Sequence, residues 1–297
     1  MSKHLFRLRD IGHAGVWRIL HGAHGQAEPE TAHEGLKGAA VPLLFAEHAA
    51  RDRLALTLSV RGMGGGEVYF GPGEWSDAAP GFVSGLGGPL CVVSGLRLSA
   101  LEMLASSVGC PLVNGGGPDA HPCRLLADIA LMRERQPDLS KMRIAWVGGA
   151  NGLAHSLIEA AMYIPFELFM ALPEWGEPDR ELLSLAFAAG AKIFLTRDIP
   201  LAATGAHYVY AGSGPPGTED GALLAGMPID GSVMAMAGPE ALMLLGQEAG
   251  CRIRDDVPTA HAALERERFA VDLKVQRLIW NWLLRENDAE GQRRDLP

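Results

Sequence analysis

The amino-acid sequence predicts an α/β protein made of two doubly wound domains, each with a parallel β-sheet covered by helices. Short apolar runs of strand length alternate with segments whose apolar residues recur at helical spacing. Segments rich in glycine and proline separate these runs, as connections between strands and helices do. With 297 residues, of which 48% are hydrophobic, the chain is long enough to build two cores.

The first half of the chain is expected to form the first sheet. Runs of strand length lie at 42–45, 67–70, 90–93 and 110–114. Helical spacing is found at 10–24, 48–60, 98–107 and from 122 onward. The segment 71–88 contains six glycines and two prolines. We therefore predict a long mobile loop there, because glycine and proline both disfavour a regular helix.

The second half repeats the pattern after a junction at 136–140. Strands are predicted at 142–147, 166–172, 192–195, 208–210 and 233–236. Helices are predicted at 153–162, 180–189, 239–247 and 262–284, with a possible short helix at 220–224. The last residues are highly charged, and we expect them to form a frayed tail.

Composition excludes several classes of protein. The net charge of −9 argues against general binding to nucleic acid or to an anionic membrane. No apolar run reaches the roughly 18 residues of a membrane span, and the N-terminus has no apolar signal core, so we expect a cytoplasmic protein. The four cysteines lack paired spacing, so neither structural zinc nor a disulfide framework is expected. The segment 148–152 lacks the spacing of a dinucleotide loop, and no cofactor is expected.

One motif is a strong candidate for an anion site. The segment 114–126 joins a short strand to a helix through three consecutive glycines, and His121 precedes Pro122 at the start of that helix. A helix N-terminus favours an anion, and an imidazole there could polarise a carbonyl group or bind a phosphate oxygen. The alternative is that His121 only caps the helix.

With three other segments, this motif resembles the aspartate/ornithine carbamoyltransferase (transcarbamylase) family, most closely its ornithine branch, over nearly the whole chain. The segments are Leu44–Glu47 leading to Arg51 and Arg53, Pro111–Gly115 leading to His121, Val147–Asn151 leading to Ser156, and Gln276–Arg277 leading to Trp282. The resemblance implies a transcarbamylase-type fold in four parts. These are a carbamoyl-phosphate-type domain at 1–136, an acceptor-type domain at 137–262, a helix at 263–286 that packs on the first domain, and a charged tail at 287–297.

The resemblance also implies a donor site with altered residues. Arg51 falls on the family's phosphate-binding arginine, and Arg53 on an arginine whose role is largely structural. The serine and the threonine before that arginine are alanine here, and Asp52 replaces the next threonine. Each lost hydroxyl contact to a charged group costs roughly 1.5–3 kcal/mol, and Asp52 adds repulsion unless it pairs with an arginine. The alternative for Arg51 and Arg53 is a salt bridge with Glu47 or Asp52.

Two further positions affect the carbamoyl group. His121 is retained as the donor to the carbamoyl oxygen, but Arg124 stands where the family has glutamine, and Ser94 where it has arginine. Arg124 would add positive charge to an anion site. The alternative is that Arg124 is a solvated residue on the helix surface.

The implied acceptor site has lost its contacts to an amino acid. Asn151 and Ser156 are retained, whereas Gly152 replaces the second asparagine and Asp272 replaces a late arginine. A site built to hydrogen-bond ornithine would not tolerate these losses, so ornithine is not the expected acceptor.

Two functions are consistent with these residues. The favoured one is a divergent transferase that moves a carbamoyl or related acyl group from a phosphate-bearing donor to another amine, with His121 as the catalytic residue. The alternative is an inactive paralogue that binds a small anion or acts as an assembly subunit. Either way, the resemblance implies a homotrimer or a multiple of it, or a hetero-oligomer with an active paralogue, and an anionic ligand such as carbamoyl phosphate.

Overall fold

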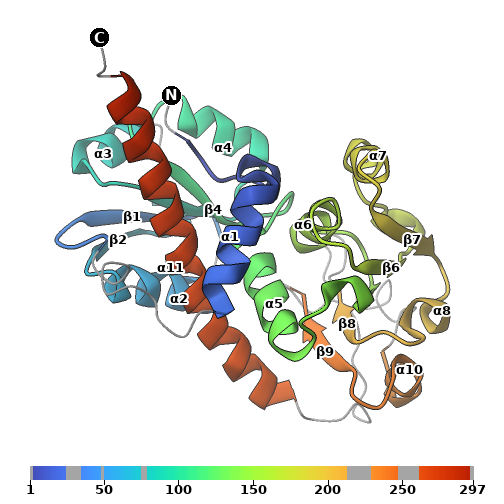
Figure 1. The fold of residues 1–297 in the computed structure, drawn as a ribbon. Helices are drawn as coiled ribbons and strands as arrows, with labels where there is room; N and C mark the ends of the chain where they lie inside the picture. The colour runs from blue at the N-terminus through green and yellow to red at the C-terminus, as the bar shows by residue number, and fades with distance from the viewer. Residues whose placement is uncertain are drawn as a thin grey trace. The chain divides into compact units, whose positions relative to one another are not determined.

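A computed structural model describes residues 3–24, 35–47, 50–74, 79–212, 229–246 and 261–294 (Figure 1). The chain forms two compact units. The first contains Met1–Glu134 and Glu267–Pro297, and the second contains Arg135–Arg266. The predicted α/β class is confirmed, because each unit has a sheet whose paired strands are all parallel within the described ranges.

The first unit contains a four-stranded sheet in the order β2-β1-β3-β4. Its strands are β1 (Ala40–Phe45), β2 (Gly66–Phe70), β3 (Cys91–Ser94) and β4 (Leu112–Gly116). Its helices are η1 (Leu8–Asp10), α1 (Gly12–His24), α2 (Ala50–Gly62), α3 (Ala79–Leu86), α4 (Leu98–Ala105) and α5 (Pro122–Arg135), together with most of α11 (His261–Arg294). The two inner strands are buried nearly throughout, as expected when helices cover both faces of a parallel sheet.

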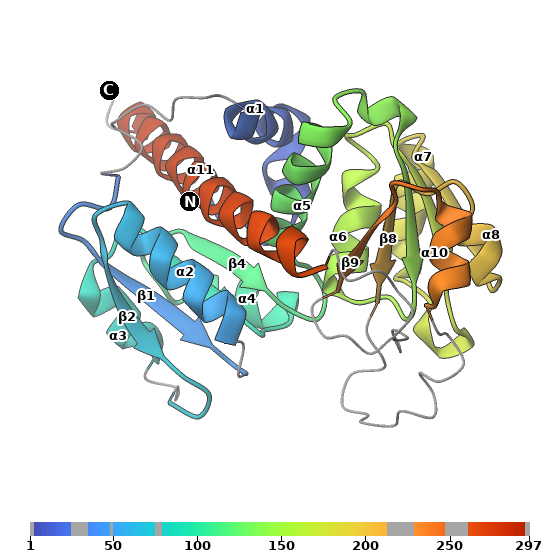
Figure 2. The same cartoon turned by 90° about the horizontal axis from the view of Figure 1, so that it is seen from below.

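The long helix α11 returns to the first unit, as the sequence predicted. It runs alongside α2 (Figure 2), and the Ser59 hydroxyl on α2 donates a hydrogen bond to Gln276 Oε1 on α11 at 2.8 Å. Trp280 and Leu283 on α11 are completely buried. Because of this packing, residues near the end of the chain lie beside α2.

The second unit contains a five-stranded sheet in the order β7-β6-β5-β8-β9. Its strands are β5 (Arg143–Val147), β6 (Glu167–Ala171), β7 (Lys192–Thr196), β8 (Tyr208–Ala211) and β9 (Leu242–Leu245). Its helices are η3 (Leu139–Lys141), α6 (Gly152–Ala160), η4 (Glu174–Gly176), α7 (Arg180–Ala188), α8 (Ile199–Ala203) and α10 (Gly231–Ala237). Chain order and sheet order differ at β5, which lies between β6 and β8.

Two predictions near the end of the second unit are wrong, because the predicted strand is a helix and the predicted helix contains a strand. The segment 233–236 is part of helix α10, and 239–247 contains strand β9. Asp230 starts α10 by accepting hydrogen bonds from the backbone N–H groups of Ser232 and Val233, both at 3.0 Å. Gly238, with φ of 140°, ends it. Periodicity alone does not distinguish a short buried strand from a short buried helix.

Two segments expected to lack regular structure contain helix. The predicted loop 71–88 contains α3, with Pro80 in the first helical turn, where proline is tolerated. The predicted tail continues α11 to Arg294. It begins on an anchor: Asn287 accepts a hydrogen bond from the Lys3 backbone N–H at 2.7 Å and donates one to the Lys3 carbonyl at 3.1 Å. The short helix predicted at 220–224 lies outside the described residues. None of the described helices is long and apolar enough to cross a membrane.

Candidate functional site

The first turn of α2 begins shortly after strand β1 and presents two arginines on either side of an aspartate. Asp52 is 8% exposed, whereas Arg53 is exposed. The Arg53 guanidinium lies over the Tyr69 ring, 5.2 Å from its centroid, which is a surface cation–π contact. Arg53 is thus placed toward strand β2, while Arg51 and Asp52 face charged residues of the same unit.

His121 lies at the start of α5 and is 2% exposed. Its Nε2 atom is 3.8 Å from Asp52 Oδ2, so the imidazole faces a carboxylate. The preceding loop is fixed by Asn114, whose amide donates to the carbonyls of Phe6 and Ala120 at 3.0 and 3.1 Å and accepts from the Gly116 backbone at 3.0 Å. These three hydrogen bonds fix the loop that precedes His121.

Arg51 forms an ion pair that the sequence did not predict. Its Nη1 atom is 3.0 Å from Asp272 Oδ2 on α11 and 3.7 Å from Asp52 Oδ1. The other carboxylate oxygen of Asp272 accepts a hydrogen bond from Gln276 Nε2 at 3.0 Å. The alternative of a salt bridge with Asp52 is confirmed for Arg51, but the shorter contact is to Asp272.

A second group of charges lies deeper in the same unit. Arg268 on α11 and Asp128 on α5 form a two-pronged pair with both contacts at 2.6 Å, and both side chains are almost completely buried. Arg124, one turn before Asp128, is only 5% exposed. The alternative that Arg124 is a solvated surface residue is therefore wrong. Its Nε atom is buried and has no hydrogen-bond partner among the described residues.

These residues form one set, which we call the aspartate–arginine network. The set comprises Arg51, Asp52, His121, Arg124, Asp128, Arg268 and Asp272, all in the first unit. Three arginines face three aspartates, so the network is neutral when His121 is uncharged. The two carboxylates nearest Arg51 occupy the region in which the sequence predicted binding of an anion.

Burial and charge shift the pKa values of the two carboxyl groups in opposite directions. Burial tends to raise the pKa of Asp52, but the contact with His121 and the charges of Arg124 and Arg51 outweigh it and hold this pKa below its usual value. Burial raises the pKa of Asp272 despite the charges of Arg51 and Arg124. At neutral pH, Asp52 is the better compensated of the two carboxylates.

This difference predicts opposite pH dependences for two variants. Because the folded-state pKa of Asp52 lies below its usual value of 3.8, its charge stabilises the fold above that pH, and the contribution disappears as the pH falls further. The stability lost in Asp52→Asn should therefore shrink as the pH is lowered through this range. Asp272, with a raised pKa, contributes most at low pH, so the stability lost in Asp272→Asn should grow on acidification. Urea unfolding of both variants and wild type across the acid range tests this, and parallel slopes would contradict it.

The predicted acceptor residues lie in the second unit, at the start of α6. Asn151 caps this helix, because its Oδ1 atom accepts hydrogen bonds from the Leu153 and Ala154 backbone N–H groups at 3.0 and 3.1 Å. Gly152 is the first residue of α6 and is buried, and Ser156 is 1% exposed. Asn151 therefore caps the helix, and Gly152 and Ser156 are packed within it.

From the sequence, Asp272 was interpreted only as a lost acceptor contact, and the polar face of α11 that meets α2 and α5 was missed. Arg268, Asp272 and Gln276 are spaced four residues apart, so they share one face of the helix, and all three are buried. Polar residues at a spacing normally occupied by apolar ones were a readable signal of a buried polar network. The partners of these residues on α2 and α5 could not be identified from the sequence, because they are far away in the chain.

Comparisons with known proteins agree with the geometry of the fold. Residues 3–134 match the family model described as aspartate/ornithine carbamoyltransferase, carbamoyl-P binding domain. The chain is 36% identical to an ornithine carbamoyltransferase of Nitratidesulfovibrio vulgaris, over 96% of this chain and 100% of the relative. It is 33% identical to one of Oleidesulfovibrio alaskensis, over 96% and 99%. The crystal structure of ornithine carbamoyltransferase from Thermus thermophilus superposes with a TM-score of 0.81 at 24% identity, covering 96% of this chain and 99% of that one.

Proposed function

Because this chain belongs to the aspartate/ornithine carbamoyltransferase family, we propose that it keeps the family fold as an assembly subunit and does not carbamoylate ornithine. The observation that carries the proposal is the Arg51–Asp272 pair at 3.0 Å, with Asp52 placed between Arg51 and His121. Arg51, the residue expected to bind a phosphate, already forms ion pairs with carboxylates of the same chain.

The energy of a competing phosphate supports this proposal. Two unit charges about 4 Å apart interact by about 4 kcal/mol at an effective dielectric constant of 20. A dianion beside Arg51 would meet Asp52 and Asp272 as well, so two repulsions would oppose its attraction to Arg51. Moving Asp272 aside would leave a carboxylate that is 3% exposed without its ion-pair partner, which is costly.

The second unit supports the exclusion of ornithine. Asn151 uses its side-chain oxygen to cap α6, and Gly152 has no side chain to offer. A site that recognises an amino acid by hydrogen bonds loses most of its affinity when those partners are absent.

An assembly role is supported by apolar side chains on the surface of α2. Leu54 and Leu58 are 52% and 39% exposed, and residues four apart share a helix face. Exposed apolar patches on soluble proteins mark contacts with other chains. We expect a homotrimer, and light scattering coupled to gel filtration measures its mass; a monomer would contradict the assembly role.

The second candidate is a transferase that uses another donor and another amine. It is favoured by Arg124, whose pKa is lowered to about 10 by burial and by the charge of Arg268. Arg124 is thus a buried cation that its neighbours do not fully compensate, and an added anion beside it would be stabilised. His121, three residues earlier, would then donate to the reacting carbonyl.

Calorimetric titration with carbamoyl phosphate and with inorganic phosphate separates the two candidates. For wild type we expect no binding up to about 10 mM, and no citrulline from ornithine. The double variant Asp52→Thr, Asp272→Asn removes both carboxylates and should bind phosphate at least ~10-fold more tightly than wild type, and adding Arg51→Ala should abolish the gain. Glu102→Gln, in an exposed salt bridge of the same unit, is the matched control. Millimolar binding by wild type that is lost in Arg51→Ala would overturn our proposal and favour the transferase candidate.

A further inference from the structure

A cavity of about 660 Å³ lies in the second unit, at the edge of the sheet where strands β8 and β9 begin. Tyr208 and Leu242, the first residues of these strands, are paired in register and both line the cavity. The candidate acceptor residues Asn151–Ser156 follow the opposite, carboxyl end of β5. Four or five residues of strand separate the two edges, or roughly 15 Å, so this cavity is a separate site.

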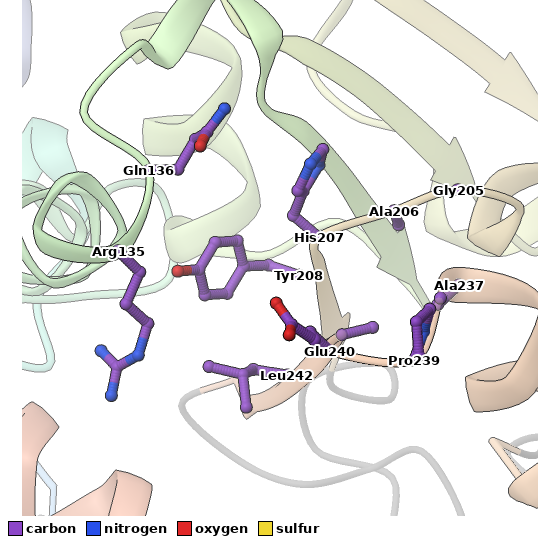
Figure 3. A pocket seen from close by; sticks show the side chains of 12 residues that line it. Arg135, Gln136, Gly205, Ala206, His207, Tyr208, Ala237, Pro239, Glu240 and Leu242 are labelled. Carbon is purple, nitrogen blue, oxygen red and sulfur yellow. The ribbon is translucent and has the colours of Figure 1, made fainter.

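The walls combine apolar surface with polar and charged side chains. Figure 3 shows Arg135, Tyr208 and Glu240 around the cavity, with the Tyr208 hydroxyl directed toward the side from which Arg135 comes. Neither the Tyr208 hydroxyl nor the Glu240 carboxylate has a hydrogen-bond or ion-pair partner among the described residues. Apolar surface comes from Ala237 and Leu242.

His207 also lines the cavity, and the surroundings of His207 and Tyr208 indicate where each side chain carries its proton. His207 Nδ1 accepts a hydrogen bond from the Arg143 backbone N–H at 3.1 Å, so the neutral ring carries its proton on Nε2 and presents a donor. Burial raises the pKa of Tyr208, although the charge of Arg135 opposes the shift, so its hydroxyl remains protonated at neutral pH. Tyr208, His207 and Arg135 are therefore donors, and Glu240 is an acceptor with negative charge.

We propose that this cavity binds a small zwitterionic amino acid with an apolar side chain. Its carboxylate would accept hydrogen bonds from Arg135 and the Tyr208 hydroxyl, and its ammonium group would pair with Glu240. The helix α10 ends at the lining residue Ala237, and a helix C-terminus favours a positive group. The apolar lining receives the side chain, and the volume lies within the range of about 300–1,000 Å³ usual for ligand sites. This site is independent of the function proposed for the first unit.

The test uses L-leucine and two matched analogues with the full-length protein. The analogue 4-methylpentanoate lacks the ammonium group, and 3-methylbutylamine lacks the carboxylate. Isothermal calorimetry should show that L-leucine binds with a dissociation constant of a few millimolar or better and that each analogue binds at least ~10-fold more weakly, because each loses a charge-assisted contact. No binding of L-leucine up to about 10 mM, or equal binding of either analogue, overturns the proposal.

Variants locate the binding within the cavity. Glu240→Gln and Tyr208→Phe should each weaken L-leucine binding, by about tenfold for the former, and Glu181→Gln on exposed α7 should leave it unchanged. Glu240 is exposed, so its variant should fold normally even if the change at the buried Tyr208 affects stability. L-Leucine binding that is unaffected by Glu240→Gln places the ligand elsewhere and overturns the assignment of this cavity.

Discussion

Replacing Asp128 with asparagine is expected to destabilise the protein by about 3–5 kcal/mol, because it leaves the charge of Arg268 buried without a counter-charge. Both side chains are almost completely buried, at 1% and 0% exposure, and the pair is held by two contacts of 2.6 Å. Asp128 also compensates the buried charge of Arg124, so its loss would weaken the compensation of a second arginine. The free energy of unfolding from urea titrations, followed by circular dichroism, measures the effect.

Two controls separate charge from packing. Glu102→Gln breaks the partly exposed pair with Arg7, which is 2.8 Å long, and should change stability by about 1 kcal/mol or less. The double variant Asp128→Leu, Arg268→Met removes both charges and should recover much of the loss, since apolar replacements of a buried pair are often neutral or stabilising. A loss in Asp128→Asn no larger than in Glu102→Gln would show that the pair is not buried as described.

Replacing Gly116 with alanine is expected to cost about 2–6 kcal/mol, the sum of a strained backbone and an overfilled core. Gly116 has a φ of 137°, which side chains rarely adopt, and an added Cβ would lie 2.4 Å from His121 Nε2. The His121 ring is 2% exposed and faces Asp52, so it has little room to move. Thermal and urea unfolding of the variant measure this cost.

Gly66 is the matched control for Gly116 in the same unit. Its added Cβ would meet no atom within 4 Å, so Gly66→Ala should change stability by roughly 0.5 kcal/mol or less. If Gly116→Ala were equally harmless, His121 would not be packed against the β4–α5 connection. That result would contradict the close packing of the His121 ring and its contact with Asp52.

Most of the fold was predictable because its signals are local. Except for β9, the strands of both sheets were found from short apolar runs, and α2, α5 and α11 from helical spacing, since each element buries one continuous surface. The exchange of helix and strand at α10 and β9 was not predictable, because both segments are short and apolar. There the choice was made by the Asp230 cap and by the pairing of β9 with β8.

The candidate site, like the fold, was predictable only in part. The sequence by itself determined the family-type fold and which side chains are present near each strand end: Arg51, His121 and Asn151. Only the tertiary structure decided that Arg51 pairs with Asp272, 221 residues away in the chain, and that Arg124 is buried. An arginine beside an aspartate can bind a ligand or neutralise its neighbour, and which of these it does depends on charges that meet only when the chain folds.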